Sequence, residues 1–223
     1  MYTFYEQPKY AVSGLDNPPI GYELFIRQWN NNGWQLPKDF NAITSQTLRD
    51  LLYETIESMP NNVIMLSFNL EQSQFIDPKF LQMVADVQSR TDIKIFTELT
   101  ERIAPGVTNQ ELIDAGRRFH EAGLYVCIDD VGTGQNTPGL VLGMNDYINE
   151  YKFAFQNFRP FNDINEIKQK LDFWYNLAQE KGKLLAIEGL EDQKELETVK
   201  EKYPCFVVQG YLMGKPQRVE QGE

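Results

Sequence analysis

Residues 127–134, CIDDVGTG, place two adjacent aspartates between a short apolar run and a glycine-rich turn. The run that precedes them, LYVCI, has the length and the residue types of a buried strand. Asp129 and Asp130 therefore stand at the carboxyl end of that strand. Because two neighbouring carboxylates repel each other, this position predicts a positive group or a bound cation beside the pair.

The same pattern recurs along the chain, where apolar runs alternate with amphipathic helical stretches as in β/α units. The predicted strands cover residues 21–29, 62–70, 93–99, 124–130, 147–155, 183–189 and 205–212. The predicted helices lie in TSQTLRDLLYETIESM, DPKFLQMVADVQSR, TNQELIDAGRRFHEAG, DINEIKQKLDFWYNLAQEKG and EDQKELETVKEK. Thr44 or Ser45 is the expected N-cap of the first helix. Gly123 and Gly182 are expected to end two helices in the left-handed conformation.

Polar residues at the strand ends decide between an open parallel sheet and a closed barrel. They are Asn69, Glu98, Asp129, Asp130, Lys152, Glu188 and Gln209. Taken alone, such a residue is more often a helix N-cap or a solvated turn residue. Their recurrence at six successive strand ends favours one shared site. A closed barrel brings all these ends to one face, whereas an open sheet would spread them apart, so we expect a barrel.

Composition narrows the class of protein. The chain has 223 residues, of which 42% are hydrophobic, and it carries a formal net charge of −11. This size fits one large domain, here residues 1–223. The acidic balance excludes a general DNA-, RNA- or membrane-surface binder. No secretory leader and no apolar run near the roughly 18 residues of a spanning helix is visible, so we expect a cytoplasmic protein.

The cysteines and the single histidine limit the chemistry. Cys127 and Cys205 lie in apolar runs without metal-ligand spacing, and we expect them to be reduced core residues. His120 is the only histidine and lies on a predicted helix, where a surface position is expected. Chemistry built on histidine pairs is therefore excluded, and carboxylates are left to carry it.

Carboxylate and amide oxygens are hard ligands, so a ring of them points to Mg²⁺ or Mn²⁺. Five carboxylates would meet at the mouth of the barrel, and without cations they would not all stay ionised. These carboxylates belong to Glu23, Glu98, Asp129, Asp130 and Glu188. Two ions about 4 Å apart would offset four of these charges, in the arrangement that cleaves phosphodiesters.

Lys152 and the VGTG segment each allow two interpretations of their role. Lys152 would orient the attacking water or a phosphate oxygen, or it would form a salt bridge at the rim. The glycines of VGTG predict a mobile loop above the site. The alternative, a phosphate-cradling loop, is rejected because the run lacks both the GxxxxGK[ST] and the GxGxxG pattern.

Six segments, taken together, resemble the motifs of the EAL domain, the bacterial cyclic di-GMP phosphodiesterase. They are ELFIR, FNLEQ, TELTE, IDDVGTG, IEGLE and QGYLMGKP, and the resemblance covers about residues 5–216. It implies a TIM-type (β/α)8-like barrel with an antiparallel first strand. It also implies hydrolysis of one phosphodiester bond of cyclic di-GMP to linear pGpG, and a homodimer.

The resemblance assigns roles to individual residues. Glu23, Asn69, Glu98 and Asp129 would hold one Mg²⁺ or Mn²⁺ ion, and Asp129 and Asp130 would hold the other. Glu188 would act as general base or orient the attacking water, with Lys152 as the second catalytic residue. Arg27 and Gln209 would contact the dinucleotide. Glu101 and Glu191 would support the loop beside the site.

The chain departs from the family pattern at three places. Leu24 and Phe25 replace the alanine and leucine of the name-giving tripeptide, and GTGQNTPG lacks the usual aromatic residue and serines. Ala154 stands where the family has an aspartate beside the second ion. Weaker binding of that ion and slow or absent hydrolysis are expected. Three hypotheses follow: a cyclic di-GMP phosphodiesterase, a degenerate EAL domain that binds cyclic di-GMP or a protein partner, and a phosphodiesterase for another nucleotide.

Overall fold

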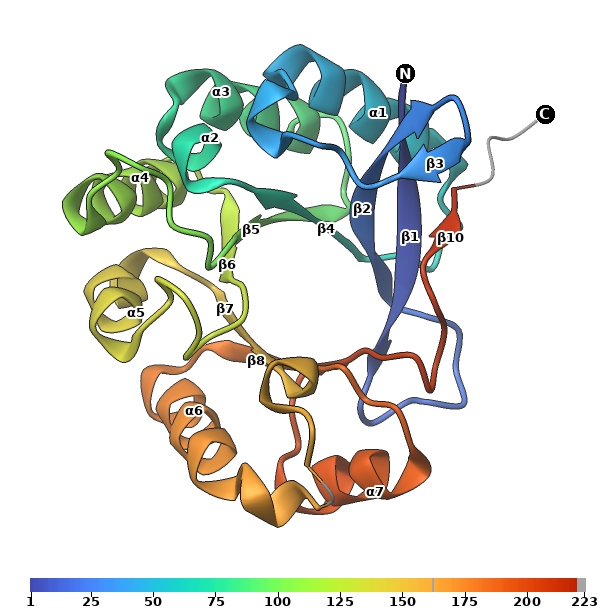
Figure 1. Cartoon of the computed structure of the whole chain (residues 1–223), viewed down its shortest axis with the longest axis vertical. Coiled ribbons are helices and arrows are strands. Elements are labelled where there is room, and N and C mark those ends of the chain that lie inside the picture. Colours follow the sequence, from blue (N-terminus) through green and yellow to red (C-terminus); the bar gives the residue numbers. More distant parts are fainter. Residues whose placement is uncertain (162, 220–223) are drawn as a thin grey trace.

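The computed structural model describes residues 1–161 and 163–219, which form a closed ring of strands with helices outside it (Figure 1). Eight strands make the ring, and the pairing of β1 with β2 closes it. They are β1 (Tyr2–Ala11), β2 (Gly21–Asn30), β4 (Met65–Leu70), β5 (Lys94–Leu99), β6 (Tyr125–Ile128), β7 (Glu150–Ala154), β8 (Leu184–Glu188) and β9 (Val207–Val208). Strand β1 runs antiparallel to both of its barrel neighbours, β2 and β9. The predicted α/β barrel with an antiparallel first strand is confirmed.

Helices follow most strands, as β/α units require. They are α1 (Ser45–Ser58), α2 (Gln72–Ile76), α3 (Pro78–Gln88), α4 (Asn109–Glu121), α5 (Pro138–Met144), α6 (Lys168–Lys181) and α7 (Gln193–Lys202). The side chain of Thr44 caps α1 by accepting a hydrogen bond from the backbone N–H of Thr47. Gly123 and Gly182 have positive φ angles of 71° and 62° just beyond α4 and α6, as expected. Short 3₁₀ turns cover Phe40–Ala42, Asn145–Tyr147, Phe155–Phe158 and Ile164–Glu166.

Several elements differ from their predicted extent. The strand expected at 205–212 is reduced to the two residues of β9, and α6 begins five residues later than the helical pattern at 163–182 because a 3₁₀ turn precedes it. The antiparallel first strand had no predicted residue range, and the short strands β3 (Gly33–Gln35) and β10 (Gln217–Arg218) were not predicted. In β1 the residues that face the barrel interior include Gln7 and Lys9, so its sequence lacks an apolar stripe.

The apolar core has two parts. The larger part fills the space between barrel and helices and includes Leu52, Val84 and Phe119. The smaller part consists of Met65, Phe96, Cys127, Ala186 and Val207. Cys127 is buried and Cys205 half-buried, and both are free thiols. None of the helices in residues 1–161 and 163–219 combines the length and apolarity needed to cross a bilayer.

Candidate functional site

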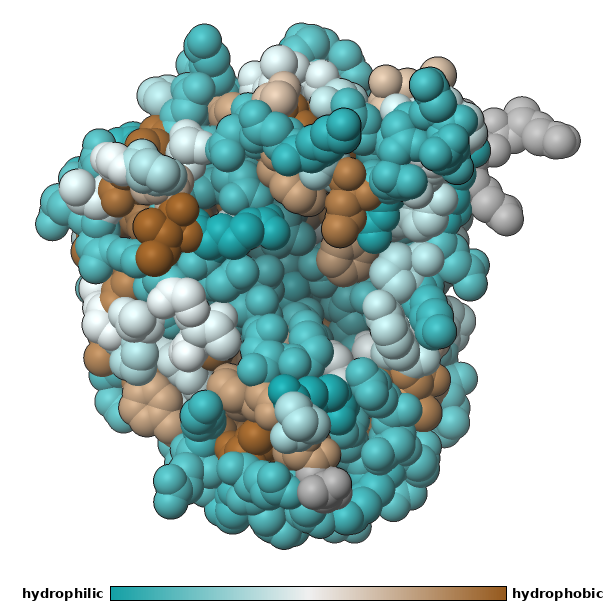
Figure 2. All heavy atoms as spheres, viewed as in Figure 1, coloured by the Kyte–Doolittle hydropathy of each residue, from teal (hydrophilic) through white to brown (hydrophobic). Residues whose placement is uncertain are grey.

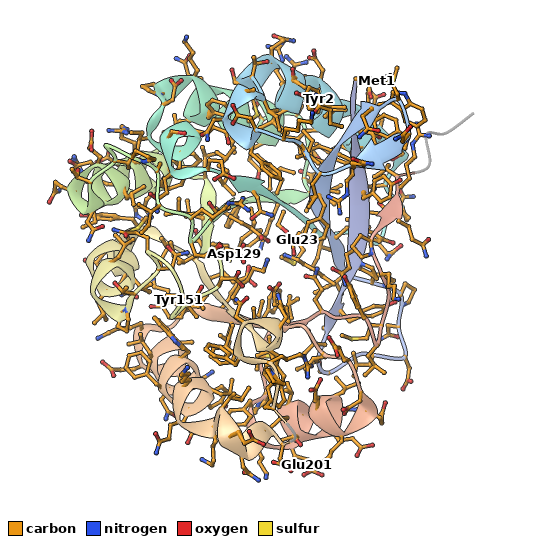
Figure 3. The ribbon with its side chains drawn as sticks, in the orientation of Figure 1. Met1, Tyr2, Glu23, Asp129, Tyr151 and Glu201 are labelled. Atoms are coloured by element: carbon orange, nitrogen blue, oxygen red, sulfur yellow. The ribbon has the colours of Figure 1, made fainter. Side chains whose placement is uncertain are left out.

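The carboxyl ends of the parallel strands surround a cavity of about 430 Å³. In the space-filling view the molecule is hollowed at its centre, and mostly hydrophilic residues line the hollow (Figure 2). Figure 3 labels Glu23 and Asp129 near the centre of the ring, from strands on different sides of it. The cavity lining includes these predicted site residues: Glu23, Arg27, Asn69, Glu101, Asp129, Asp130, Lys152, Glu188, Glu191 and Gln209.

Lys152 lies at the centre of four carboxylates. Its ammonium is 3.0 Å from Glu23 Oε2, 2.6 Å from Glu98 Oε2, 3.0 Å from Asp129 Oδ1 and 3.0 Å from Glu188 Oε2. The side chain is 1% exposed, so the alternative of a salt bridge at the rim is wrong. Burial disfavours the ammonium, but the four carboxylates hold the pKa of Lys152 above its usual range. The positive group expected beside Asp129 is thus supplied by the chain itself.

A second buried lysine, Lys9, escaped the sequence reasoning. Its ammonium donates to Glu98 Oε1 at 2.8 Å and to Ser67 Oγ at 2.6 Å, and the residue is fully buried. Burial works against ionisation of Glu98, but Lys152 and Lys9 together hold the pKa of that carboxyl well below its usual range. The sequence signal that could have indicated this interior charge is a lysine inside a run of strand-forming residues.

Asp129 and Asp130 form a second group with Glu101, in which one oxygen of each residue lies within 4.8 Å of the others. Burial raises the pKa of Asp129 to about 7, although the positive charge of Lys152 acts to lower it. Burial, together with Asp129 and Glu188, raises the pKa of Asp130 to about 8. Asp130 also has a φ of +46°, a left-handed conformation uncommon for residues other than glycine. This turn directs the Asp130 side chain beside that of Asp129.

The two oxygens of Glu188 have different partners. Its Oε2 contacts Lys152, and its Oε1 accepts a hydrogen bond of 3.0 Å from Gln156 Nε2. Burial raises the pKa of Glu188, opposed by Lys152. The following residue, Gly189, has its carbonyl bound by Arg159 at 3.0 Å. Gln156 and Arg159 therefore position the end of β8, and neither was singled out from the sequence.

The remaining predicted residues take different places around the cavity. Gln209 Nε2 donates to Glu23 Oε2 and to Gln7 Oε1, each at 3.0 Å. Asn69 Nδ2 donates to Glu23 Oε1 at 3.1 Å. Arg27 is half-buried, with its guanidinium 5.4 Å from the ring centre of Tyr5 and 5.8 Å from that of Phe25. These side chains line the cavity.

Glu191 and Ala154 are not among the residues that contact Lys152. Glu191 is exposed, and its carboxylate is 3.4 Å from Arg159 Nε. Ala154 is buried at the end of β7, where it pairs with Glu188 in the strand register. Another carboxylate, Glu150, is fully buried two residues before Lys152. Within the described residues neither Glu150 oxygen has a hydrogen-bond partner, and burial raises its pKa to about 7.

The donor set fits a hard divalent cation. The converging atoms of Glu101, Asp129 and Asp130 are all carboxylate oxygens, which Mg²⁺ and Mn²⁺ prefer. Asp130 Oδ1 is buried, and within the described residues it has no hydrogen-bond partner, so it has a vacant acceptor. Glu23, Glu98 and Asp129 are already held by lysine ammonium groups.

Comparisons with known proteins agree with this architecture. A sequence model of the EAL domain matches residues 4–216. The EAL enzyme Bd1971, bound to cAMP and cyclic di-GMP, superimposes with a TM-score of 0.72 at 24% identity, over 98% of this chain and 62% of that chain. The PaMucR phosphodiesterase in complex with cyclic di-GMP gives 0.77 at 20%, over 99% and 93%. The FimX EAL domain from Pseudomonas aeruginosa, bound to cyclic di-GMP, gives 0.74 at 14%, over 99% and 93%.

These likenesses show the fold alone, because all three identities are below 25%. The chain spans about 62% of the length of Bd1971. No curated protein sequence matches the chain.

Proposed function

The chain belongs to the EAL domain family, and we propose that it is a metal-dependent phosphodiesterase that hydrolyses cyclic di-GMP to linear pGpG. The observation that carries this proposal is the ring of four carboxylates around Lys152, joined through Asp129 to the Glu101 and Asp130 group. A receptor that only bound the nucleotide would have little physical need for so many buried acidic groups. The PaMucR and FimX structures, which hold cyclic di-GMP, support the choice of ligand.

Two sets of residues would hold the divalent ions, Mg²⁺ or Mn²⁺. Asp129 and Asp130, together with Glu101, would hold one ion. The other ion would lie among Glu23, Asn69, Glu98 and Asp129. Lys152 would then have to give up some of its contacts with these carboxylates. When bound, the ions would polarise the phosphate oxygens and favour ionisation of the attacking water.

Glu188 is the proposed general base. Because the pKa of Glu188 is raised, its carboxylate accepts a proton at a pH closer to neutral than an exposed glutamate does. The hydrogen bond from Gln156 fixes the orientation of this carboxylate. It would take the proton of the water that attacks phosphorus. The bond between phosphorus and the 3′ oxygen then breaks, since pGpG carries a 5′ phosphate, and the leaving 3′ oxygen would take a proton from solvent to become the free 3′ hydroxyl. Once cations share the charge of the carboxylates, Lys152 would turn to the phosphate oxygens.

Arg27 and Gln209 would bind the dinucleotide. In a chain with a net charge of −11, an anionic substrate needs a local cation at the mouth. The Arg27 guanidinium lines the cavity and is held beside the rings of Tyr5 and Phe25. Gln209, fixed between Gln7 and Glu23, would contact the substrate from the cavity wall.

The direct test is product formation. We expect purified protein with millimolar Mn²⁺ and cyclic di-GMP to yield pGpG on chromatography, and EDTA to stop the reaction. Absence of pGpG while cyclic di-GMP still binds would reject the phosphodiesterase. A panel of other cyclic nucleotides, assayed under the same conditions, tests the hypothesis of a different substrate.

A second candidate function is a cyclic di-GMP receptor without turnover. Ala154 favours it, because the family's carboxylate beside the second ion is missing. The contacts of Lys152 favour it too, because its ammonium already satisfies carboxylates that a metal would need. Binding of cyclic di-GMP in EDTA, without any pGpG when Mn²⁺ is restored, would identify the receptor.

The resemblance to the family also extends the proposal to a homodimer that acts in the cytoplasm. Sedimentation equilibrium tests the first point, since a monomer has a mass of 25.9 kDa. Fractionation of cells that express the protein tests the second.

A further inference from the structure

Glu101, Asp129 and Asp130 come from two different loops. Contacts beyond the ends of the strands must therefore hold the two loops at a fixed spacing. The β5–β6 ladder ends with the pair Leu99 and Ile128. Past this point one backbone hydrogen bond, from Asp129 N–H to the Leu99 carbonyl at 3.1 Å, continues the connection. This hydrogen bond reaches neither Glu101 nor Asp130, so the relative placement of those two residues depends on further contacts between the loops.

The side chain of Asn136 supplies a further connection between the two segments. Its Nδ2 donates to the Leu99 carbonyl at 3.1 Å and to the Asp129 carbonyl at 2.5 Å. The residue is fully buried, and within the described residues its Oδ1 has no hydrogen-bond partner. The amide therefore acts only through its two N–H donors. A serine would offer one donor, and an aspartate would turn an oxygen toward two carbonyls.

The loop that carries Asn136 also packs against the backbone of Glu101. Gln135 N–H donates to the Glu101 carbonyl at 2.8 Å. Gly134 lies so close that an added Cβ would be 2.3 Å from the same carbonyl oxygen. Gly132 N–H donates to the Asn136 carbonyl at 2.8 Å, which closes the loop back on the Asp130 turn. The loop thus contacts both halves of the carboxylate group.

We propose that Asn136 is a positioning residue of the cation site, which holds the Glu101 loop and the Asp129–Asp130 turn at the spacing a divalent ion requires. The inference rests on the proposed function, because the ion is the one proposed there. Supporting groups that fix metal ligands typically change metal affinity by about 10- to 100-fold when they are removed. We infer an effect of that size for the loss of both Asn136 donors.

The test measures Mn²⁺ binding to the protein alone, by calorimetry and by the loss of the free-ion electron paramagnetic resonance signal. Asn136→Ala should raise the dissociation constant of Mn²⁺ about 10- to 100-fold, and Asn136→Ser should raise it less. Asn149→Ala is the matched control, since the Asn149 side chain accepts a hydrogen bond of 2.9 Å from Val126 at the opposite end of β6. It should lower the melting temperature without changing Mn²⁺ affinity.

The outcomes separate this proposal from the proposed function. An unchanged Mn²⁺ affinity in folded Asn136→Ala, or an equal loss in Asn149→Ala, would overturn the role of Asn136. If Asn136→Ala does not fold by circular dichroism, the same comparison is made with Asn136→Ser. A loss confined to the Asn136 variants, in a protein that forms no pGpG, would support the positioning role while the phosphodiesterase fails. Absence of Mn²⁺ binding by the unaltered protein would overturn both.

Discussion

The ammonium of Lys152 lies 2.6 Å from Oε2 of Glu98, and both side chains are at most 1% exposed. The other oxygen of Glu98 is held by Lys9 at 2.8 Å. Two cations therefore keep one carboxylate ionised in the interior of the barrel, directly below the cavity. Such a pair is stable only while both signs of charge are present, because either one alone would be buried without a counter-charge.

Replacement of Lys152 by methionine should destabilise the protein strongly. It removes the common partner of four carboxylates, and breaking a buried ion pair costs about 3–5 kcal/mol of unfolding free energy. The control is Lys194→Met, which removes the exposed pair of Lys194 with Asp163 and should cost far less, because solvent screens that pair. Urea unfolding of both variants measures the difference. Equal losses would contradict the role of Lys152 as the buried counter-charge.

Replacement of Ala154 by aspartate should increase pGpG formation. Ala154 pairs in register with Glu188, so an added carboxylate there would lie near the proposed base and the second ion. We expect a gain of about tenfold or more in kcat, the scale on which supporting metal-site groups act. Ala154→Asn has nearly the same size without the charge and should not reproduce the gain. No change in the aspartate variant would mean that another group already serves this position.

Replacement of Glu188 by glutamine should remove the proposed base while it keeps the shape of the side chain. We expect kcat to fall about 10²- to 10⁴-fold, with the affinity for cyclic di-GMP measured by calorimetry little changed. The control is Glu180→Gln on α6, where the carboxylate is 68% exposed and pairs with its neighbour Lys181. Turnover that survives in Glu188→Gln would assign the base to a different residue.

The stability of the metal-free protein should fall as the pH rises from about 5.5 to 8.5. The folded-state pKa values of Asp129 and Asp130, about 7 and about 8, lie above those of an unfolded chain. The folded state therefore binds more protons than the unfolded state in this range, and raising the pH removes that advantage. Melting temperatures in EDTA at a series of pH values measure the effect.

Two further measurements test the same assignment. Mn²⁺ affinity should rise over this pH range, because the protons of Asp129 and Asp130 must leave before an ion binds. Asp130→Asn should flatten the pH dependence of stability, since asparagine tolerates the left-handed backbone at this position and does not titrate. A slope unchanged in Asp130→Asn would assign the titration elsewhere, with Glu150 the next group to replace.

Much of the fold and the place of the site followed from patterns that are local in sequence. The strand that ends at Ile128 was predictable because its apolar run is short and is followed by a polar turn. The N-cap at Thr44 was predictable because a capping side chain acts within three residues. Strand β1 was not predictable in the same way. It places Gln7 and Lys9 inside the barrel, against the usual rule that interior positions are apolar.

The sequence by itself determined that polar residues meet at one end of a β/α barrel, because strand direction and helix alternation set which ends share a face. Only the tertiary structure decided which of those residues touch. Closure of the sheet brings Lys152 against Glu23, 129 residues away, and Lys9 against Glu98, 89 residues away. No local pattern carries such pairings, because they depend on the register of strands that are distant in the chain. For the same reason Lys152, which the sequence left at either the centre or the rim, lies buried among four carboxylates.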